Sequence, residues 1–252
     1  MAIIGIIGGS GVYELPELTN VTPCVTDTPY GRVEHIQEGE LDGNTIFFLP
    51  RHGVSHHIPP HCVNYRANID AFDQCGVEKI FALNTVGGIS PTTEPGAVVI
   101  PDQIIDYTYG REHTFYDGSD DTLAHIEFEY PLSEDLRNAL IEASLEVAEE
   151  GDFGELSVVQ RGVYGCTQGP RLETAAEIRR LQQDGCDVVG MTLMPEAALA
   201  REAAIHYASL CIVVNWGAGL GHEPIQINEV MSLIENSAPT LREILRKSPR
   251  FL

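Results

Sequence analysis

Short apolar runs recur along the chain, and most of them stop at glycine or at polar residues. Ile3 to Ile7 runs into Gly8-Gly9, and Thr45 to Leu49 runs into Pro50-Arg51-His52. A short apolar run bounded by turn residues is typical of a strand buried in a sheet. Runs of the same kind cover residues 80–83, 97–100, 157–164, 187–190 and 209–214. The pattern predicts buried strands whose ends carry the polar and glycine-rich segments.

Helical patterns lie between several of these strands. Ser133 is placed to cap a helix with an acidic first turn, and Thr174 with Glu177 has the spacing of a capping box. Pro195 suits the first turn of a helix predicted over 196–204. A last helix near 228–246 must bend or break at Pro239, because proline cannot donate the backbone hydrogen bond.

The alternation of strands and helices predicts an α/β fold, with a mixed central sheet flanked by helices on both faces. In such sheets the ligand site lies beyond the carboxyl ends of the strands. We find no internal repeat or linker, so residues 1–252 are expected to form one domain. The least regular stretch, 111–130, is interpreted as a long functional loop or an inter-subunit element.

Charge and composition exclude several classes of function. The chain has 15 Lys and Arg against 37 Asp and Glu, a formal net charge of -22, so nucleic acid and anionic membranes are poor partners. It has neither an apolar segment long enough to span a membrane nor a basic leader, which predicts a cytoplasmic protein. Its six cysteines form no C-x-x-C pair, which argues against a zinc site or a disulfide framework.

The first strand ends in a glycine-rich turn that could hold a small anion. Read as a dinucleotide fingerprint from Gly9, this turn fails, because Glu14 occupies the position of the third glycine. It also lacks the lysine of a P-loop. What remains is a turn whose backbone N–H groups and Ser10 hydroxyl suit an anion, or an ordinary tight turn without a ligand.

Arg51-His52-Gly53 is a stronger anion signal, because it follows a buried strand directly. A guanidinium at the edge of the sheet can direct two N–H groups to two phosphate oxygens. Four histidines lie within ten residues, at His52, His56, His57 and His61. Gly53 and Pro59-Pro60 argue against a helix that would present them to a metal, so we expect no metal and interpret the histidines as neutral groups of a ligand loop.

Three further strand ends carry candidate ligands. Asn84 and Thr85 follow one strand, and Thr192 precedes a helix whose N-terminus favours an anion. Asn215 follows the apolar run 212–214 and is placed to share a layer with these residues. For each, an ordinary strand-to-turn transition is the simpler alternative.

Taken together, these segments resemble the methylthioadenosine phosphorylase and purine nucleoside phosphorylase family, trimeric enzymes that cleave purine nucleosides with inorganic phosphate. The resemblance covers nearly the whole chain and includes Pro50-Arg51-His52-Gly53, residues 63–68, Gly110-Arg111-Glu112, residues 115–118, residues 169–174 and Met191-Thr192. It implies a nucleoside phosphorylase fold and a homotrimer or hexamer. It also implies no metal or organic cofactor, with phosphate as a co-substrate. Asn64 and Tyr65 are interpreted as the start of a helix.

The resemblance also assigns roles to individual residues. Phosphate would be held by Ser10, Arg51, His52, Asn84 or Thr85, and Thr192, with Arg51, His52 and Asn215 carrying the catalysis. Met191 would contact the ribose, whereas Asn215, Trp216 and Gly217 would face the base. Specificity at the 5′ position would depend on Glu173, Ile227, His56 and the neighbouring subunit's His125.

The chain departs from the family's pattern at Asn215, where members that use 6-aminopurines carry Asp. A protonated aspartic acid can give N7 of adenine a proton, whereas an asparagine amide can only share hydrogen bonds. Opposite a 6-oxopurine, the amide N–H₂ can donate to O6 while its C=O accepts from a protonated N7. The asparagine therefore favours hypoxanthine as the leaving base.

The 5′ side of the sugar decides between ordinary nucleosides and methylthio nucleosides. An apolar Ile227 suits a methylthio group, although Glu173 could accept a hydrogen bond from a 5′-hydroxyl. We therefore expect phosphorolysis of 5′-methylthioinosine. The alternatives are a methylthioadenosine phosphorylase, a general inosine and guanosine phosphorylase and, from another class, a non-catalytic nucleoside-binding protein.

Overall fold

The structure is a computed structural model that describes residues 2–118, 124–221 and 223–252. Its strands are β1 (Ile3–Gly8), β2 (Thr19–Thr28), β3 (Gly31–Leu41), β4 (Asn44–Pro50), β5 (Lys79–Gly88), β6 (Val98–Val99), β7 (Gln103–Asp106), β8 (Val158–Val159), β9 (Val163–Cys166), β10 (Val188–Gly190) and β11 (His206–Trp216). Its helices are α1 (Tyr65–Gln74), α2 (Glu134–Glu150), α3 (Ala175–Gln183), α4 (Leu193–Glu202) and α5 (Ile227–Lys247), with short 3-10 helices η1 (Pro60–Cys62) and η2 (Ser248–Phe251).

The strands form one mixed sheet with β5 at its centre, so the predicted fold class is confirmed. The order is β2-β3-β4-β1-β5-β10-β9-β7, and β11 also pairs with β5. β1 and β11 run parallel to β5, whereas β10 runs antiparallel to it. The carboxyl ends of β1, β4, β5 and β11 therefore lie on the same side of the sheet, at the ends of its strands.

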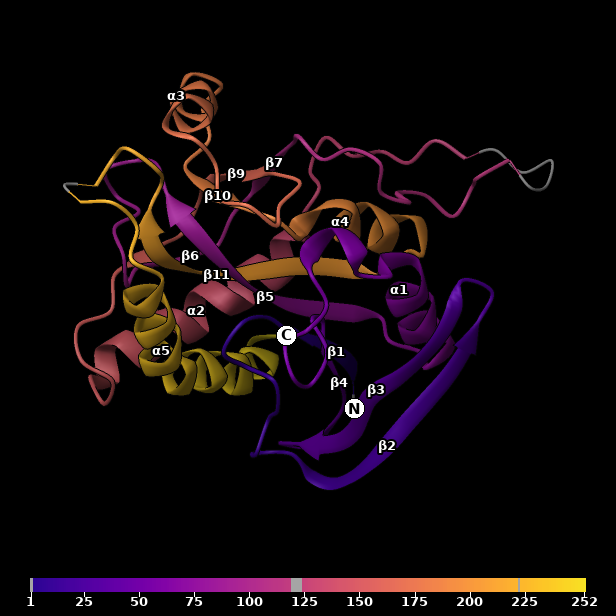
Figure 1. The fold of residues 1–252 in the computed structure, drawn as a ribbon. Helices are drawn as coiled ribbons and strands as arrows, with labels where there is room; N and C mark the ends of the chain where they lie inside the picture. The colour runs from indigo at the N-terminus through magenta and orange to yellow at the C-terminus, as the bar shows by residue number, and fades with distance from the viewer. Residues whose placement is uncertain (1, 119–123, 222) are drawn as a thin grey trace.

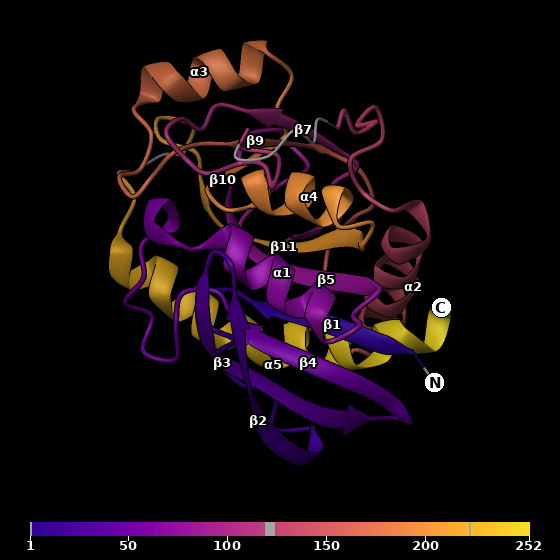
Figure 2. The same cartoon turned by 90° about the vertical axis from the view of Figure 1, so that its right-hand side faces the viewer.

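Helices cover both faces of this sheet, as Figures 1 and 2 show: α1 and α4 lie on one side, and α2 and α5 on the other. Alternate strand residues feed the two cores. In β1, Ile7 packs in the cluster that contains Phe72 of α1, and Ile6 packs in the cluster that contains Leu140 of α2. The sheet thus has two buried faces, which is why its strands appear as continuous apolar runs.

The long hairpin of β2 and β3 is absent from the sequence prediction. Most of its side chains are exposed, so it lacks the continuous apolar runs that marked the other strands. It forms the edge of the sheet, where only every second or third position of β3 is buried.

The predicted helix signals are confirmed in part. Asn64 caps α1, and Thr174 with Glu177 forms a complete capping box at α3. Ser133 stands at the N-cap of α2, but its side chain makes no capping hydrogen bond. Of the two outcomes expected at Pro239, α5 does not break: it continues through the proline as one helix, which is bent in Figure 1.

The predicted irregular stretch between β7 and α2 has no helix or strand in its described parts, 111–118 and 124–130. Residues 119–123 of this stretch lie outside the described residues. In Figure 1 the segment projects away from the sheet beyond α4. Phe115, Ile126 and Phe128 of its described parts pack against the core cluster that contains Phe72.

Candidate active site

A cavity of about 510 Å³ lies at the ends of β1, β4, β5, β10 and β11. It brings together most of the residues that the sequence singled out. The lining includes Ser10, Arg51, His52, His56, Asn84, Thr85, Glu173, Met191, Thr192 and Asn215. Segments as far apart in the chain as those of Ser10 and Asn215 therefore line one cavity, where their common place at strand ends led us to expect them.

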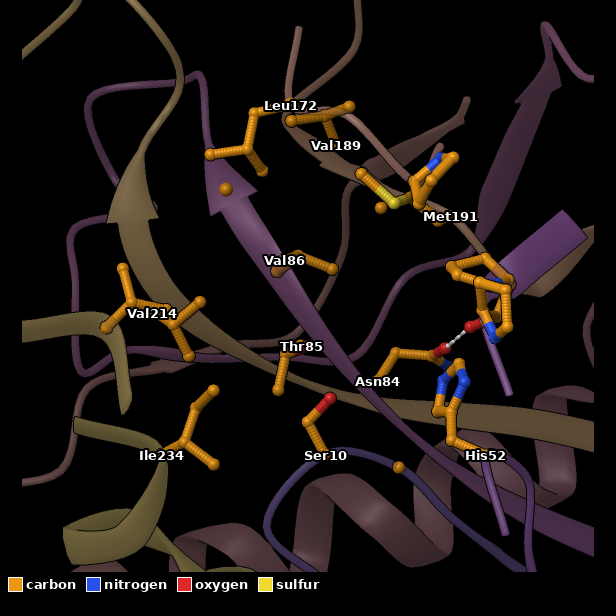
Figure 3. Close-up of a pocket in the computed structure, with 18 of the residues that line it drawn as sticks. Ser10, His52, Asn84, Thr85, Val86, Leu172, Val189, Met191, Val214 and Ile234 are labelled. Carbon is orange, nitrogen blue, oxygen red and sulfur yellow. Dashed lines mark hydrogen bonds between the residues drawn. The ribbon is translucent and has the colours of Figure 1, made fainter. Parts of the chain in front are cut away.

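Four of the polar residues gather at one end of the cavity. Figure 3 shows Ser10, Thr85, Asn84 and His52 on one side, with Leu172 and Val189 at the opposite end. A small anion and an organic group can therefore bind in the same cavity, each at its own end.

The Asn84 amide links two other side chains by hydrogen bonds at the polar end of the cavity. Its Nδ2 donates to the Ser209 hydroxyl at 2.7 Å, and its Oδ1 accepts the Thr192 hydroxyl. Within the described residues, the hydroxyls of Ser10 and Thr85 make no side-chain hydrogen bond and remain free to donate. Of the two alternatives for the β5 ligand, this geometry favours Thr85 as the direct donor and Asn84 as its support.

Arg51 is fully buried, and its bidentate partner in the structure is Glu196. Nε and Nη2 each lie 2.7 Å from a Glu196 oxygen, and Nη1 donates to the Leu83 carbonyl at 2.9 Å. Tyr207 adds a hydrogen bond of 2.7 Å to the same carboxylate. Burial alone would lower the pKa of the guanidinium, but the charge and hydrogen bonds of Glu196 outweigh it and hold the pKa above its usual value. Arg51 therefore keeps only two of its five N–H groups for a ligand.

His52 is neutral near pH 7. Burial, followed by the charge of Arg51, lowers its pKa to about 4. Its Nδ1 lies 2.8 Å from the Ile58 carbonyl, which can only accept, so Nδ1 carries the proton and Nε2 is the bare acceptor. A protonated phosphate oxygen or a sugar hydroxyl is the kind of partner that such a nitrogen can take.

The other histidines of the loop bind polar neighbours. The His56 ring lies 4.8 Å from the His52 ring, and its Nδ1 is 3.2 Å from the Tyr13 hydroxyl. His57 contacts the Ser55 hydroxyl at 3.0 Å. Across the described part of the chain, no three His, Cys, Asp or Glu side chains are grouped so that they could hold a metal ion.

Asn215 lies at a β-bulge of β11, where the register against β5 shifts between Val213 and Asn215. The bulge re-aims the amide toward the cavity. One N–H of Nδ2 donates to the Trp216 carbonyl at 2.7 Å, which leaves the second N–H and the amide oxygen for a ligand. Trp216 and Gly217 line a neighbouring cavity of about 630 Å³ instead, so of the three predicted base contacts only Asn215 lines the main cavity.

Glu173 forms part of the wall between the main cavity and another of about 390 Å³. The Thr167 hydroxyl donates to its Oε1 at 2.6 Å, and Oε2 has no hydrogen-bond partner within the part of the chain that the structure describes. One oxygen of this carboxylate is therefore left for a ligand.

Two predicted specificity residues lie outside the main cavity. Ile227 is 59% exposed at the start of α5, while Val230 and Ile234 line the cavity from the same helix. These three residues share one helical face, at i, i+3 and i+7. The helical periodicity of the sequence could therefore have pointed from Ile227 to Val230 and Ile234. His125 is exposed on the projecting segment between β7 and α2.

Polar side chains that suit an anion and apolar side chains thus line one cavity at the strand ends of a mixed sheet. The chain belongs to the phosphorylase superfamily, whose model matches residues 3–248. Within it, the chain is an enzyme of the purine nucleoside phosphorylase type.

Relatives and solved structures agree with this placement. The chain is 47% identical to a probable S-methyl-5'-thioinosine phosphorylase of Xylella fastidiosa, over 98% of both chains. It is 43% identical to a 6-oxopurine nucleoside phosphorylase of Pyrococcus furiosus, over 97% of this chain and 91% of the other. A methylthioadenosine phosphorylase of Schistosoma mansoni, solved with adenine, superposes with a TM-score of 0.90 at 33% identity, over 98% of this chain and 91% of the other.

Proposed function

We propose that the protein cleaves 5′-methylthioinosine with inorganic phosphate, giving hypoxanthine and 5-methylthioribose 1-phosphate. The observation that carries this proposal is that an amide, Asn215, and a carboxylate, Glu173, line the same cavity, and we reassign Glu173 from the 5′ side to the base. The names of the relatives support the same substrate class.

The base end matches the edge of a 6-oxopurine. The free N–H of Asn215 can donate to O6, and its oxygen can accept from a protonated N7. Oε2 of Glu173 can accept from N1–H, which hypoxanthine carries and adenine lacks. Opposite adenine, the carboxylate would face a second acceptor. Each such mismatch costs ~1–3 kcal/mol, or about one to two decades in rate.

The 5′ end matches a methylthio group. Val230 and Ile234 present apolar side chains where Ile227 was expected, and neither can hydrogen-bond a 5′-hydroxyl. His56 lines the same cavity, and we propose that the neighbouring subunit's His125 approaches it in a homotrimer or hexamer.

In the reaction, a phosphate oxygen attacks the anomeric carbon as the bond from that carbon to N9 breaks. Ser10, Thr85 and the remaining N–H groups of Arg51 would donate to phosphate, with Thr192 and His52 beside them. The electron pair of the broken bond passes to the purine, N7 takes up a proton from solvent water, and the amide oxygen of Asn215 would accept a hydrogen bond from that N7–H. Positioning carries most of the catalysis, because phosphate itself is the nucleophile.

We further propose that residues 1–252 act as one domain in the cytoplasm, without a metal or organic cofactor, and without nucleic acid or a membrane as partner. None of the helices in the described part of the chain is both long and apolar enough to cross a membrane.

The test compares kcat/KM for methylthioinosine, methylthioadenosine, inosine and adenosine in the presence of phosphate. We expect methylthioinosine to be the best substrate. Methylthioadenosine as the best substrate would refute the assignment of the base, and inosine would refute that of the 5′ side. Binding of nucleoside without release of base would refute the reaction itself.

A further inference from the structure

Arg111 is a buried cation outside the cavity lining. It belongs to the Gly110-Arg111-Glu112 segment, which starts the long irregular stretch between β7 and α2, and it is 9% exposed. Among the described residues, no Asp or Glu lies within ion-pair distance of its guanidinium. A buried charge without a counter-ion requires hydrogen bonds to compensate it.

Those hydrogen bonds occupy all five N–H groups of the side chain. Nη1 donates to the Met191 and Met194 carbonyls at 2.8 and 2.6 Å. Nη2 donates to the Gln168 and Thr167 carbonyls at 2.8 and 3.2 Å. Nε donates to Oε1 of Gln168 at 3.2 Å. One planar group therefore joins two separate segments of backbone.

Both segments lead directly to the substrate cavity. Met191 and Thr192 line it, between β10 and α4. Thr167 follows β9, its N–H donates to the Gly190 carbonyl at 2.8 Å, and its hydroxyl holds Glu173 at 2.6 Å. The first segment serves the sugar and phosphate, and the second serves the base.

A longer contact reaches a third wall. Nη1 of Arg111 lies 3.3 Å from the Tyr65 hydroxyl, and this hydroxyl donates to the Pro60 carbonyl at 2.9 Å. Pro60 lines the cavity in the histidine-rich loop. The guanidinium thus lies behind the cavity surface and contacts three segments that form or support its wall.

We propose that Arg111 is a positioning residue that holds the base-side segment Thr167–Gln168 in register with the phosphate-side segment 191–194. The inference rests on the proposed function only in that both segments serve a nucleoside and phosphate. Because nucleophile and leaving base must be aligned through the sugar, a small shift between these segments lowers the rate.

Lysine cannot replace Arg111 in this arrangement of hydrogen bonds. Its ammonium has three donors and no planar fork, so it cannot serve five acceptors spread over two segments. Arg111→Lys therefore retains the charge and removes the geometry.

The chain offers a matched control in Arg137, which is 1% exposed and remote from the cavity lining. Its Nε and Nη2 donate to the Pro101 and Gln160 carbonyls at 2.8 and 2.7 Å, and, unlike Arg111, it also forms an ion pair, with Glu134. Arg137→Lys thus reports what the loss of a buried, carbonyl-bound guanidinium does to the protein in general.

The experiment measures kcat and KM for the best nucleoside substrate of the wild type, together with Tm. For Arg111→Lys we expect kcat/KM to fall by about tenfold to a hundredfold, with KM for the nucleoside raised at least about threefold. For Arg137→Lys we expect a lower Tm, with KM for the nucleoside within about twofold of the wild-type value. KM is the decisive quantity, because it does not depend on how much of the enzyme is folded.

If Arg111→Lys does not fold, Gln168→Leu supplies the test, since it removes only the acceptor of Nε and a 3.1 Å contact from the Tyr109 N–H. It should raise KM for the nucleoside in the same direction. An unchanged KM in the folded variant, or an equal rise in Arg137→Lys, would overturn the proposal. The proposed function is tested separately, by which nucleoside the wild-type enzyme prefers. This test of Arg111 uses the preferred nucleoside whichever it is, so the two proposals can fail independently.

Discussion

The protonation of His52 makes the stability of the protein depend on pH in a defined window. The pKa of this ring is about 4 in the fold, because of burial and then the charge of Arg51, against 6.5 in an exposed histidine. Between these two values the unfolded chain binds a proton at this position and the folded chain does not. The free energy of unfolding therefore falls as the pH is lowered from 6.5 to 4, and His52 contributes no such loss above 6.5.

The magnitude follows from the two pKa values. Each unit of difference corresponds to ~1.4 kcal/mol, so His52 should cost the fold ~3 kcal/mol by pH 4. His52 is only 8% exposed, so solvent screening reduces this figure little. The slope between pH 5 and 6 should be ~1.4 kcal/mol per pH unit.

The assay is urea unfolding of wild type and His52→Gln across pH 4.5 to 7.5, at one fixed protein concentration. Carboxylates and His56 titrate in both proteins, so the difference between their free energies of unfolding isolates His52. That difference should be constant above pH 7 and should shift against the wild type below 6.5. Parallel curves over the whole range would refute the reasoning, because the ring would then titrate alike in the folded and unfolded chains.

Three further changes test other parts of the site. Asn215→Asp should raise the kcat/KM ratio of methylthioadenosine to methylthioinosine by about one to two decades, since a carboxylic acid can donate to N7 of adenine; a constant ratio would show that Asn215 does not read the base. Val230→Thr adds a hydroxyl at the 5′ end and should lower the ratio of methylthioinosine to inosine about threefold to tenfold, with Val21→Thr on the exposed edge hairpin as a control. Glu196→Gln leaves the buried charge of Arg51 unpaired and should lower the free energy of unfolding by ~3–5 kcal/mol in urea; a loss below about 1 kcal/mol would contradict the role given to that pair.

The strand ends were predictable from the sequence because each buried strand is a local signal. Apolar runs stop where the backbone leaves the core, so Ser10, Asn84, Thr192 and Asn215 could be placed in one layer before their contacts were known. Parallel pairing of β1 and β11 with β5 brings the ends that carry Ser10, Asn84 and Asn215 together, whereas Thr192 follows β10, which runs antiparallel to β5.

The contacts that the sequence could not supply are non-local. Arg51 was expected to direct its fork at phosphate, but its bidentate partner in the structure is Glu196, which lies 145 positions away in the chain. The five acceptors of Arg111 are backbone carbonyls and one amide, groups that carry no distinctive residue type. No pattern of hydrophobicity or charge marks such a partner, because any residue can offer a carbonyl.

The proposed phosphate site would explain how a chain of net charge -22 can bind an anion. Arg51 is balanced by Glu196, and His52 is uncharged, so the polar end offers an anion hydrogen bonds more than net positive charge. Neutral donors bind an anion well only when they are already aligned, since no long-range attraction compensates for a poor angle. Alignment in turn depends on the groups behind the cavity: the hydrogen-bonded Asn84 amide, the Arg51–Glu196 pair and the carbonyls gathered by Arg111. We therefore expect Arg51 and Arg111 to act on the substrate mainly by fixing the walls that touch it.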